Sequence, residues 1–529
     1  MKRFINSLFT ILTVAILMTA CKKKFDDLNL NENKPLNVPP SLLLNGILND
    51  MTEGPYSMYE RWGQYFCCNY DYYGNNRYDF GSGSNYYSTL KNVVKMEEEA
   101  LKTGAAAVNP YSAMAKFFKA CLFTKMSLQM GDIPMTEALQ GLNNLTPVYD
   151  KQKDIFLKAF VWLDSANTEL GQLINTGDNT LAGDFYMGNS LSKWRKVVNT
   201  LRLRLLIELS KKESDTDLKI KQQFSSIITN PVQYPIMTGM EDNLQYIFVD
   251  PTNKYPMNPS NFGFDALRYN TSATYISLLT SAEDPRVYVT AEPATALVAG
   301  GMSPTSFSAF IGASPGEDLG IMYVKANGGQ YSLINRNRYY QTNTGEPSIQ
   351  IGYPEMLFNI AEAINRGWIT SGPKGNAEEH YIEAIKASMA FYGIPVTGGS
   401  FNVKFLQSGS PGSSSVVYNT YNVAFDFPLF YDQTAIKYAG NNATGLTQIL
   451  NQKYIAMFRH SGLEGYYQNR RTGVPAFTTG PGTGNGTRIA KRFSYPGSEA
   501  TANTDHYQSA LQSQFGGNDD INGIMWIIN

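Results

Sequence analysis

The sequence carries little charge and almost no histidine. Lys and Arg number 44 and Asp and Glu 45, charged residues make up 17% of the 529 positions, and the formal net charge is −1. No basic stripe accompanies this balance, which excludes the electrostatic footprint of a nucleic-acid-binding protein. Only three His are present. His380 and Glu383 share a helix face but lack the H-E-x-x-H spacing of a zinc protease, and we interpret them as part of a solvated face.

Cysteine is scarce as well, with four residues in the chain. No CxxC or Cys/His spacing indicates a zinc site, and no cofactor motif is present. Cys121 lies in an apolar helical pattern and is predicted to be a core thiol. Cys67 and Cys68 leave two alternatives, a strained vicinal disulfide or two unreactive thiols, of which we expect the thiols. The chain therefore has to be stabilised by its hydrophobic core, for which it is long enough.

Apolar runs long enough to span a membrane are absent. At the N-terminus, Lys2 and Arg3 precede the apolar stretch Phe4–Ile16. This arrangement is typical of a secretory signal peptide, which we place at residues 1–20. The remainder of the chain is expected to lie in water.

The residue that follows the leader predicts an anchor. Thr19 and Ala20 are small and stand directly before Cys21, an arrangement that resembles a bacterial lipobox, in which the thiol receives a diacylglyceryl group. Each buried methylene contributes about 0.8 kcal/mol, so several acyl chains hold a protein on a membrane. The alternative is ordinary cleavage without an anchor. Residues 21–40 are polar, contain Asn and Pro, and read as a tether.

The rest of the chain alternates between helical patterns and long polar segments. Residues 233–352, 393–442 and 473–529 are rich in Asn, Ser, Thr, Pro and Gly and are predicted to be largely irregular, with one helix at Thr271–Thr280. Elsewhere apolar residues recur at helical spacing. This pattern predicts helices at Ser41–Asp50, Leu90–Lys102, Tyr111–Met130, Ile155–Leu173, Trp194–Leu209, Pro354–Trp368, Ala377–Tyr392 and Gln448–Phe458, the last of the clear ones.

Two of these helices form a recognisable pair. Small residues, Ala361 and Ala363 in one and Ala377 and Ala384 in the other, stand where the two helices must approach closely. The pair resembles a tetratricopeptide hairpin, although no strict repeat of that length runs along the chain. The fold is therefore predicted to be mainly α, with helix pairs and a long irregular loop layer in one domain at 41–529.

Several motifs, taken in order, resemble one known family. They are FDDLNLNENKP after the anchor, GDIPMTEAL, SKWRKVVNTLRLRLLIELS, SAEDPRV, EMLFNIAEA, QKYIAMFRHSGLEGYYQNRRTGVP and RFSYPGSEATAN. Together they span nearly the whole chain and resemble the SusD/RagB family of nutrient-binding outer-membrane lipoproteins of Bacteroidetes, in its SusD-like branch.

The resemblance implies a function without catalysis. It implies a lipid-anchored protein of the outer membrane, facing the cell exterior, that binds a nutrient and delivers it to a SusC/RagA-type TonB-dependent β-barrel transporter. The favoured nutrient is an oligosaccharide, because a neutral, aromatic and Asn-rich composition suits hydroxyl-bearing ligands. A peptide ligand, as in RagB-like members, is the alternative, and a surface glycoside hydrolase or a purely structural lipoprotein is the more distant one.

Aromatic residues are abundant, with 34 Tyr, and they crowd one loop. The stretch CCNYDYYGNNRYDFGSGSNYY, Cys67 to Tyr87, has no pattern that would bury its rings. A Tyr ring covers the C–H face of a sugar at little entropic cost and keeps a polar tip in water. The family resemblance places binding residues in an early loop of this kind. Our candidates are Trp62, Tyr70, Tyr72, Tyr73, Asn75, Asn76, Arg77 and Tyr78, with a second contribution from Tyr269, Tyr331, Tyr339 or Tyr340; the alternative is that these rings pack the loop onto the helices or onto the transporter.

Catalytic motifs give no competing hypothesis. GASPG at Gly312–Gly316 matches G-x-S-x-G, but the residue after the Ser must supply an oxyanion N–H, and Pro315 has none. Asp519 and Asp520 lack the spacing of an EF-hand. We therefore expect no enzyme, no metal and no cofactor.

Overall fold

The computed structural model describes residues 37–263, 265–407 and 416–529. The predicted signal peptide at 1–20, Cys21 with its predicted lipid anchor, and most of the predicted tether at 21–40 lie outside these residues. None of the described helices combines the length and the apolarity needed to cross a membrane.

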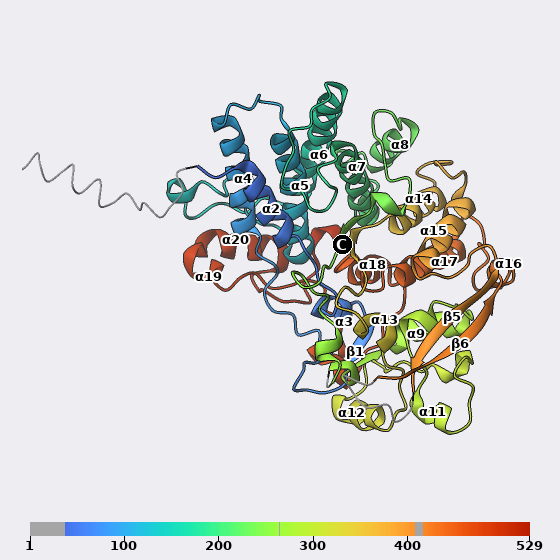
Figure 1. Ribbon diagram of the computed structural model, residues 1–529. Helices are drawn as coiled ribbons and strands as arrows, with labels where there is room; N and C mark the ends of the chain where they lie inside the picture. Colours follow the sequence, from blue (N-terminus) through green and yellow to red (C-terminus); the bar gives the residue numbers. More distant parts are fainter. Residues whose placement is uncertain (1–36, 264, 408–415) are drawn as a thin grey trace, which may run out of the picture.

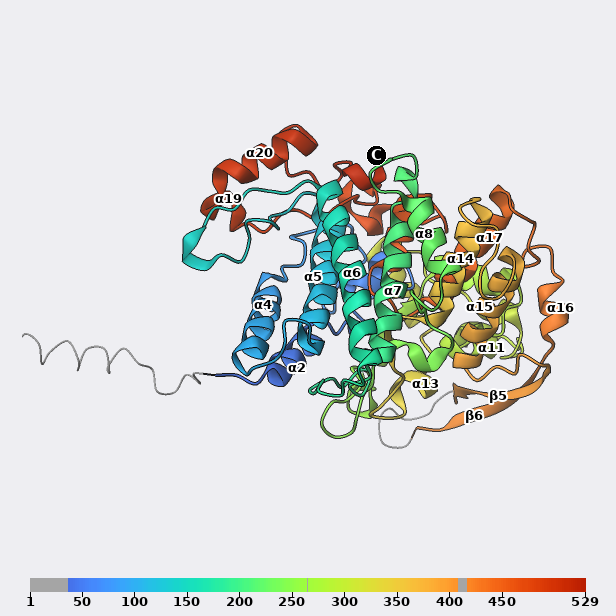
Figure 2. The ribbon, with the colours of Figure 1, turned by 90° about the horizontal axis from the view of Figure 1, so that it is seen from above.

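Helices dominate the fold, as predicted, and pack in sequential pairs (Figure 1). α5 packs on α6, α6 on α7, α7 on α14, and α14 on both α15 and α17. Figure 2 shows α4, α5, α6 and α7 side by side. The bounds of this helical layer are α2 Pro40–Asp50, α4 Tyr87–Lys102, α5 Pro110–Met130, α6 Gln152–Asn175, α7 Leu191–Glu208, α8 Ile220–Thr229, α14 Tyr353–Asn365, α15 Ala377–Phe391 and α17 Ala443–Ala456.

Local sequence signals set the ends of these helices. At the start of α5, Asn109 accepts a hydrogen bond from the backbone N–H of Ser112 at 3.0 Å, and Pro110 occupies the first turn. Both features suit a helix N-terminus. α17 begins at Ala443, earlier than the predicted Gln448, because the Asn442 side chain caps it. Side-chain capping thus extends helices beyond the apolar pattern.

The α14–α15 pair confirms the predicted tetratricopeptide-like hairpin. Ala361, Ala363, Ala377 and Ala384 are all buried where the two helices meet. Tyr381 of α15 is fully buried, and its hydroxyl donates to the backbone oxygen of Ile436 at 2.8 Å. Small side chains therefore let the helices approach, and one large ring fills the groove.

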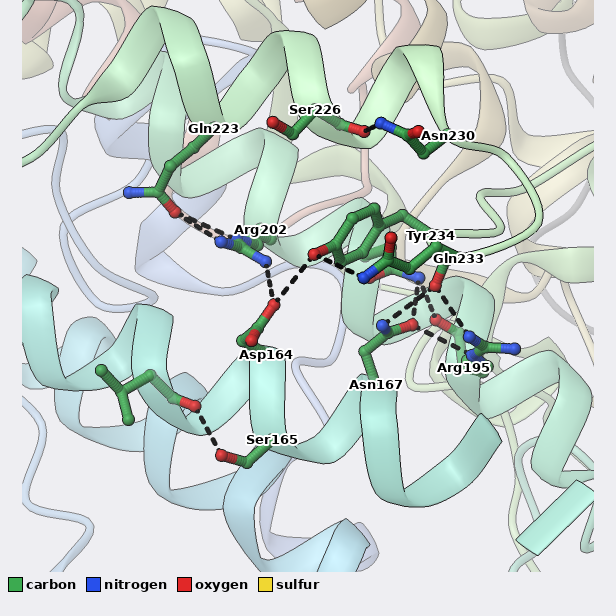
Figure 3. A network of polar contacts seen from close by, with 12 residues as sticks. Asp164, Ser165, Asn167, Arg195, Arg202, Gln223, Ser226, Asn230, Gln233 and Tyr234 are labelled. Carbon is green, nitrogen blue, oxygen red and sulfur yellow. Dashed lines mark hydrogen bonds and ion pairs between the residues drawn. The ribbon is translucent and has the colours of Figure 1, made fainter. Parts of the chain in front are cut away.

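A polar network joins α6, α7 and α8 on their outer side (Figure 3). Arg202 of α7 donates to Asp164 of α6 at 2.9 Å and to Gln223 of α8 at 2.6 Å. At the right of Figure 3, Arg195 of α7 donates to Asn167 of α6 at 3.0 Å and to the backbone oxygen of Gln233 at 2.7 Å. The network thus adds polar contacts between three successive helices that also share the hydrophobic core.

A second layer, with its own hydrophobic cluster, lies below the helices in Figure 1. It contains the short helices α3 Met58–Trp62, α9 Ala273–Ser281, α10 Val287–Thr290, α11 Thr295–Ala299, α12 Leu319–Asn327 and α13 Arg336–Tyr340. α16 Phe427–Tyr431, by contrast, buries Phe427 and Phe430 in the core of the helical layer. α9 confirms the helix predicted at Thr271–Thr280. Among the residues that the structure describes, the sheets are three antiparallel pairs, β1 Phe66–Cys68 with β3 Tyr269–Thr271, β2 Leu244–Tyr246 with β4 Ser348–Ile351, and β5 Gly399–Leu406 with β6 Tyr418–Phe425.

Several elements differ from the predicted layout, and α3, α8 and the short helices α10 to α13 were not predicted. The segment 393–442, expected to be irregular, contains the hairpin β5–β6, and three helices follow the one predicted to be last: α18 Glu464–Thr472, α19 Glu499–Ala502 and α20 Thr504–Phe515. The apolar pattern did not predict α18 because its buried side mixes charged and polar residues with Tyr466 and Tyr467. Arg471 is buried there and donates to Glu362 of α14 at 3.0 Å. Burial alone would raise the pKa of Glu362, but Arg471 and Arg366 outweigh it and lower that pKa to about 2.

Candidate functional site

The early tyrosine loop is positioned by the β1–β3 pair. In this pair Cys68 lies opposite Tyr269. The next residue, Asn69, donates from its backbone to the oxygen of Arg268 at 3.0 Å and from its side chain to the oxygen of Leu267 at 3.0 Å. Two segments that are 198 residues apart in sequence therefore leave the sheet together.

Four tyrosines gather at this point, and we call them the tyrosine platform: Tyr70, Tyr72, Tyr73 and Tyr323. The ring of Tyr323, from α12, stacks on that of Tyr70 with centroids 5.2 Å apart and an interplanar angle of 26°. The centroids of Tyr72 and Tyr73 are also 5.2 Å apart, at 77°. Tyr72 is 82% exposed, so the platform presents aromatic surface to solvent that nothing in the described chain covers.

Arg268 supports the platform from the β3 side. Its guanidinium carbon lies 4.5 Å from the centroid of Tyr70 and 5.8 Å from that of Tyr73. A guanidinium within about 6 Å of a ring centroid is attracted to the π face. The cation therefore orders two of the rings before any ligand arrives, which lowers the entropic cost of binding.

Asn76 and Tyr78 hold the base of the loop and do not face solvent, which corrects their prediction as ligand contacts. The Asn76 amide accepts a hydrogen bond from the Cys68 N–H at 2.8 Å and donates to the Cys68 oxygen at 2.9 Å. It thus pairs with β1 as a neighbouring strand would. Tyr78 is fully buried, and its hydroxyl donates to the backbone oxygen of Trp62 at 2.7 Å.

The remaining first-set candidates lie at the side of the loop. Trp62 is half-buried, donates to the oxygen of Arg77 at 2.9 Å, and packs against Phe80 with ring centroids 4.5 Å apart. Asn75 and Arg77 are exposed. The Asn75 backbone oxygen accepts a hydrogen bond from Arg61 at 3.0 Å, which fixes the loop just after Tyr73. The structure therefore brings Tyr70, Tyr72 and Tyr73 together and places Trp62 in a separate aromatic cluster.

The second set of candidates divides. Tyr339 and Tyr340 are buried in the core of the loop layer, so the prediction that they face a ligand is wrong; burial of large rings in this polar-looking segment is what forms the second core. Tyr269 is half-buried and packs edge-on against Phe66 at 5.3 Å. Tyr331 is half-buried and donates to Glu317.

Two residues of the site, Tyr323 of the platform and Arg268 beside it, were not anticipated from sequence. Tyr323 lies in α12, for which the polar segment gave no helical prediction, although Asp318 caps its N-terminus by accepting from Gly320 and Ile321. The sequence feature that could have predicted α12 is this capping Asp318 followed by the apolar residues Ile321 and Met322. Arg268 joins the site only through the pairing of β3 with β1, which no local pattern reveals.

The three described cysteines and His380 are buried in the folded chain. Cys67 and Cys68 are free and buried, as expected, and burial raises the pKa of both thiols. Cys121 is also a buried free thiol, which confirms it as part of the core. His380 is fully buried rather than solvated, because its ring packs into the α14–α15 turn and accepts from the Lys374 N–H at 3.2 Å. Within the described ranges, His, Cys, Asp and Glu form no group able to hold a metal ion.

Comparison with known proteins agrees with this architecture. The model of the SusD-like family, described as starch-binding and associating with the outer membrane, matches residues 32–496. The search of curated proteins found no match. Among solved structures, a SusD homologue from Bacteroides fragilis is 32% identical with a TM-score of 0.78, and covers 93% of this chain and 100% of its own.

Two further structures extend the comparison. A second Bacteroides fragilis SusD homologue is 28% identical with a TM-score of 0.75, again over 93% of this chain and 100% of its own. A chitin-binding SusD homologue from Flavobacterium johnsoniae is 20% identical with a TM-score of 0.67, over 93% of this chain and 98% of its own. At that identity the last similarity concerns the fold alone.

Proposed function

We propose that this chain, which belongs to the SusD-like family of outer-membrane-associated binding proteins, captures a neutral oligosaccharide on the tyrosine platform. We propose further that it delivers this sugar to a SusC-like TonB-dependent transporter. The observation that carries the proposal is the array of Tyr72, which is exposed, and the half-buried Tyr70, Tyr73 and Tyr323, with Arg268 lying over two of the rings.

The chemistry of the platform suits a sugar. Each ring offers an apolar face for the C–H side of a pyranose, while its hydroxyl stays in water for hydrogen bonding. Tyr has few rotatable bonds, so little entropy is lost when it becomes ordered. Rings contributed by one loop and one helix meet at angles from 26° to 77°, which suits successive units of a curved chain better than one flat ligand. No bond is broken in this function.

Binding is tested by calorimetry with maltohexaose, cellohexaose and chitohexaose. The double variant Tyr72→Ala with Tyr73→Ala should weaken binding of the preferred sugar by about 1–3 kcal/mol, since aromatic anchors carry most of such interfaces. The matched control is Tyr111→Ala in the first turn of α5, a half-buried tyrosine of the helical layer, and it should leave affinity unchanged. Equal affinity of a folded double variant would remove the loop from the site, and binding of peptides instead of sugars would favour the RagB-like alternative.

The anchor and the partner have their own tests. Cys21→Ala should move the protein from the membrane fraction to the soluble fraction, because no acyl chain would then hold it. The wild-type lipoprotein, extracted in mild detergent, should co-purify with a large β-barrel subunit. Isolation of the lipoprotein alone, under conditions in which related complexes stay together, would contradict delivery to a transporter.

A further inference from the structure

A cavity of about 200 Å³ lies next to the tyrosine platform. It is enclosed by the C-terminal turn of α12, the start of α11 and the chain around Arg336. Its walls include Leu267, Glu292, Thr295, Asn327, Tyr331 and Arg336. This cavity is not part of the binding surface that the proposed function assigns to the tyrosine platform.

The cavity and the platform share two pieces of structure. Tyr323 of the platform and Asn327 of the cavity are four residues apart in α12, so they lie on one face of the helix, about 6 Å apart along its axis. Leu267 lines the cavity, and the next residue, Arg268, lies over Tyr70. A ligand that leaves the platform along α12 therefore reaches the cavity within the length of a sugar unit.

One wall of the cavity is charged but electrically balanced. Arg336 and Glu292 are both buried, and Glu292 accepts from the Arg336 backbone N–H at 2.8 Å and from its Nε at 2.9 Å. Arg336 donates to this carboxylate through Nε and Nη2. A guanidinium has five N–H donors in all. The pair thus supplies fixed donors and acceptors without a net charge, which suits hydroxyl groups better than a carboxylate or an amine.

The other walls are apolar or small. Leu267, Pro293, Ala326 and Leu333 lie there. An apolar side facing a hydrogen-bonding side is the arrangement that a pyranose ring requires, because its C–H face and its hydroxyl edge need different partners. The volume of about 200 Å³ suits one hexose ring.

We infer that this cavity binds the terminal unit of a neutral oligosaccharide whose following units lie on the tyrosine platform, so that the protein recognises a chain end rather than an internal stretch. This inference rests on the proposed function. An internal unit would need space for the chain on both sides of the cavity, whereas a terminal unit needs space on one side only, and the α12 face that carries Asn327 also carries Tyr323.

The test compares cavity and platform variants with the hexasaccharide that binds best among maltohexaose, cellohexaose and chitohexaose. Ala326→Phe places a ring in the cavity from α12, and Asn327→Trp, at an exposed position, narrows it without burying a new group. Each variant should weaken binding at least tenfold while the thermal unfolding temperature stays close to that of the wild type. A crystal structure with the same hexasaccharide should show a terminal ring against Glu292 and Arg336.

The outcomes separate this inference from the proposed function. Loss of binding in the Tyr72→Ala/Tyr73→Ala variant together with unchanged affinity in folded Asn327→Trp and Ala326→Phe would overturn chain-end recognition alone. A bound hexasaccharide with both ends in solvent would do the same. If none of the three sugars bound the wild type, the proposed function and the inference would both fall.

Discussion

Arg204 of α7 and Glu355 of α14 form a buried bidentate ion pair. Nε of Arg204 donates to Oε1 of Glu355 at 2.6 Å and Nη2 donates to Oε2 at 2.5 Å, while Nη2 also reaches the backbone oxygen of Gln350 at 2.8 Å. Ser461 donates to the same carboxylate at 2.9 Å. The pair therefore links the first group of helices to the α14–α15 hairpin and to the segment that precedes α18.

Removing one partner of this pair should be costly. Arg204→Met leaves the Glu355 carboxylate buried without its main counter-charge, and such changes destabilise by about 3–5 kcal/mol. Chemical denaturation should show this loss in the free energy of unfolding. The double variant Arg204→Met with Glu355→Leu removes both charges and should cost clearly less than the single one. If the single and double variants were equally unstable, the packing of Arg204 rather than its charge would be responsible.

Glu464 should make stability depend on pH. Burial raises the pKa of its carboxyl from 4.5 to about 8, and Arg204 only partly offsets this. Between these two values the folded protein binds a proton that the unfolded chain has released, so this contribution is complete below pH 4.5 and is lost as the pH rises to about 8. The unfolding free energy of the wild type should therefore fall relative to that of Glu464→Gln across this window. A difference that stays constant with pH would contradict the burial of a protonated carboxyl.

Tyr323 should contribute its ring rather than its hydroxyl to binding. Tyr323→Ala removes the partner that stacks on Tyr70 at 5.2 Å and should weaken hexasaccharide binding by about 1–3 kcal/mol. Tyr323→Phe keeps the ring and should retain most of the affinity in the same calorimetric titration. Equal losses in the two variants would show that the hydroxyl, and not the aromatic face, makes the contact.

The buried thiols should not react with a thiol reagent in the folded protein. Cys67, Cys68 and Cys121 are buried, and burial raises the pKa of each, so little reactive thiolate forms near neutral pH. In a Cys21→Ala background, a colorimetric thiol reagent should detect no thiol before denaturation and all of the remaining ones afterwards. Rapid labelling of Cys68 in the native state would mean that the base of the loop opens.

The helical layer could be predicted because apolar periodicity decides it. α5, α6 and the α14–α15 pair bury residues at helical spacing, and their predicted bounds lie close to those observed. α18 could not be predicted in this way, since it buries Glu464, Gln468 and Arg471. The buried Arg471 of α18 pairs with Glu362 of α14, a partner far away in sequence, and no local pattern contains that information.

The candidate site was predictable as a region but not residue by residue. The concentration of Tyr with Gly and Asn pointed to the loop after Cys68, and the platform does contain Tyr70, Tyr72 and Tyr73. The same composition did not separate these rings from Tyr78, which is buried. The buried Tyr78 is held by the hydrogen bond from its hydroxyl to the Trp62 backbone oxygen, and this contact exists only in the folded chain.

The pairing of β1 with β3 holds the loop of Tyr70, Tyr72 and Tyr73 against Arg268, and α12 adds Tyr323 from a distant part of the chain. The complete patch therefore exists only in the folded chain, and a nascent chain that ends before α12 would lack one of its four rings.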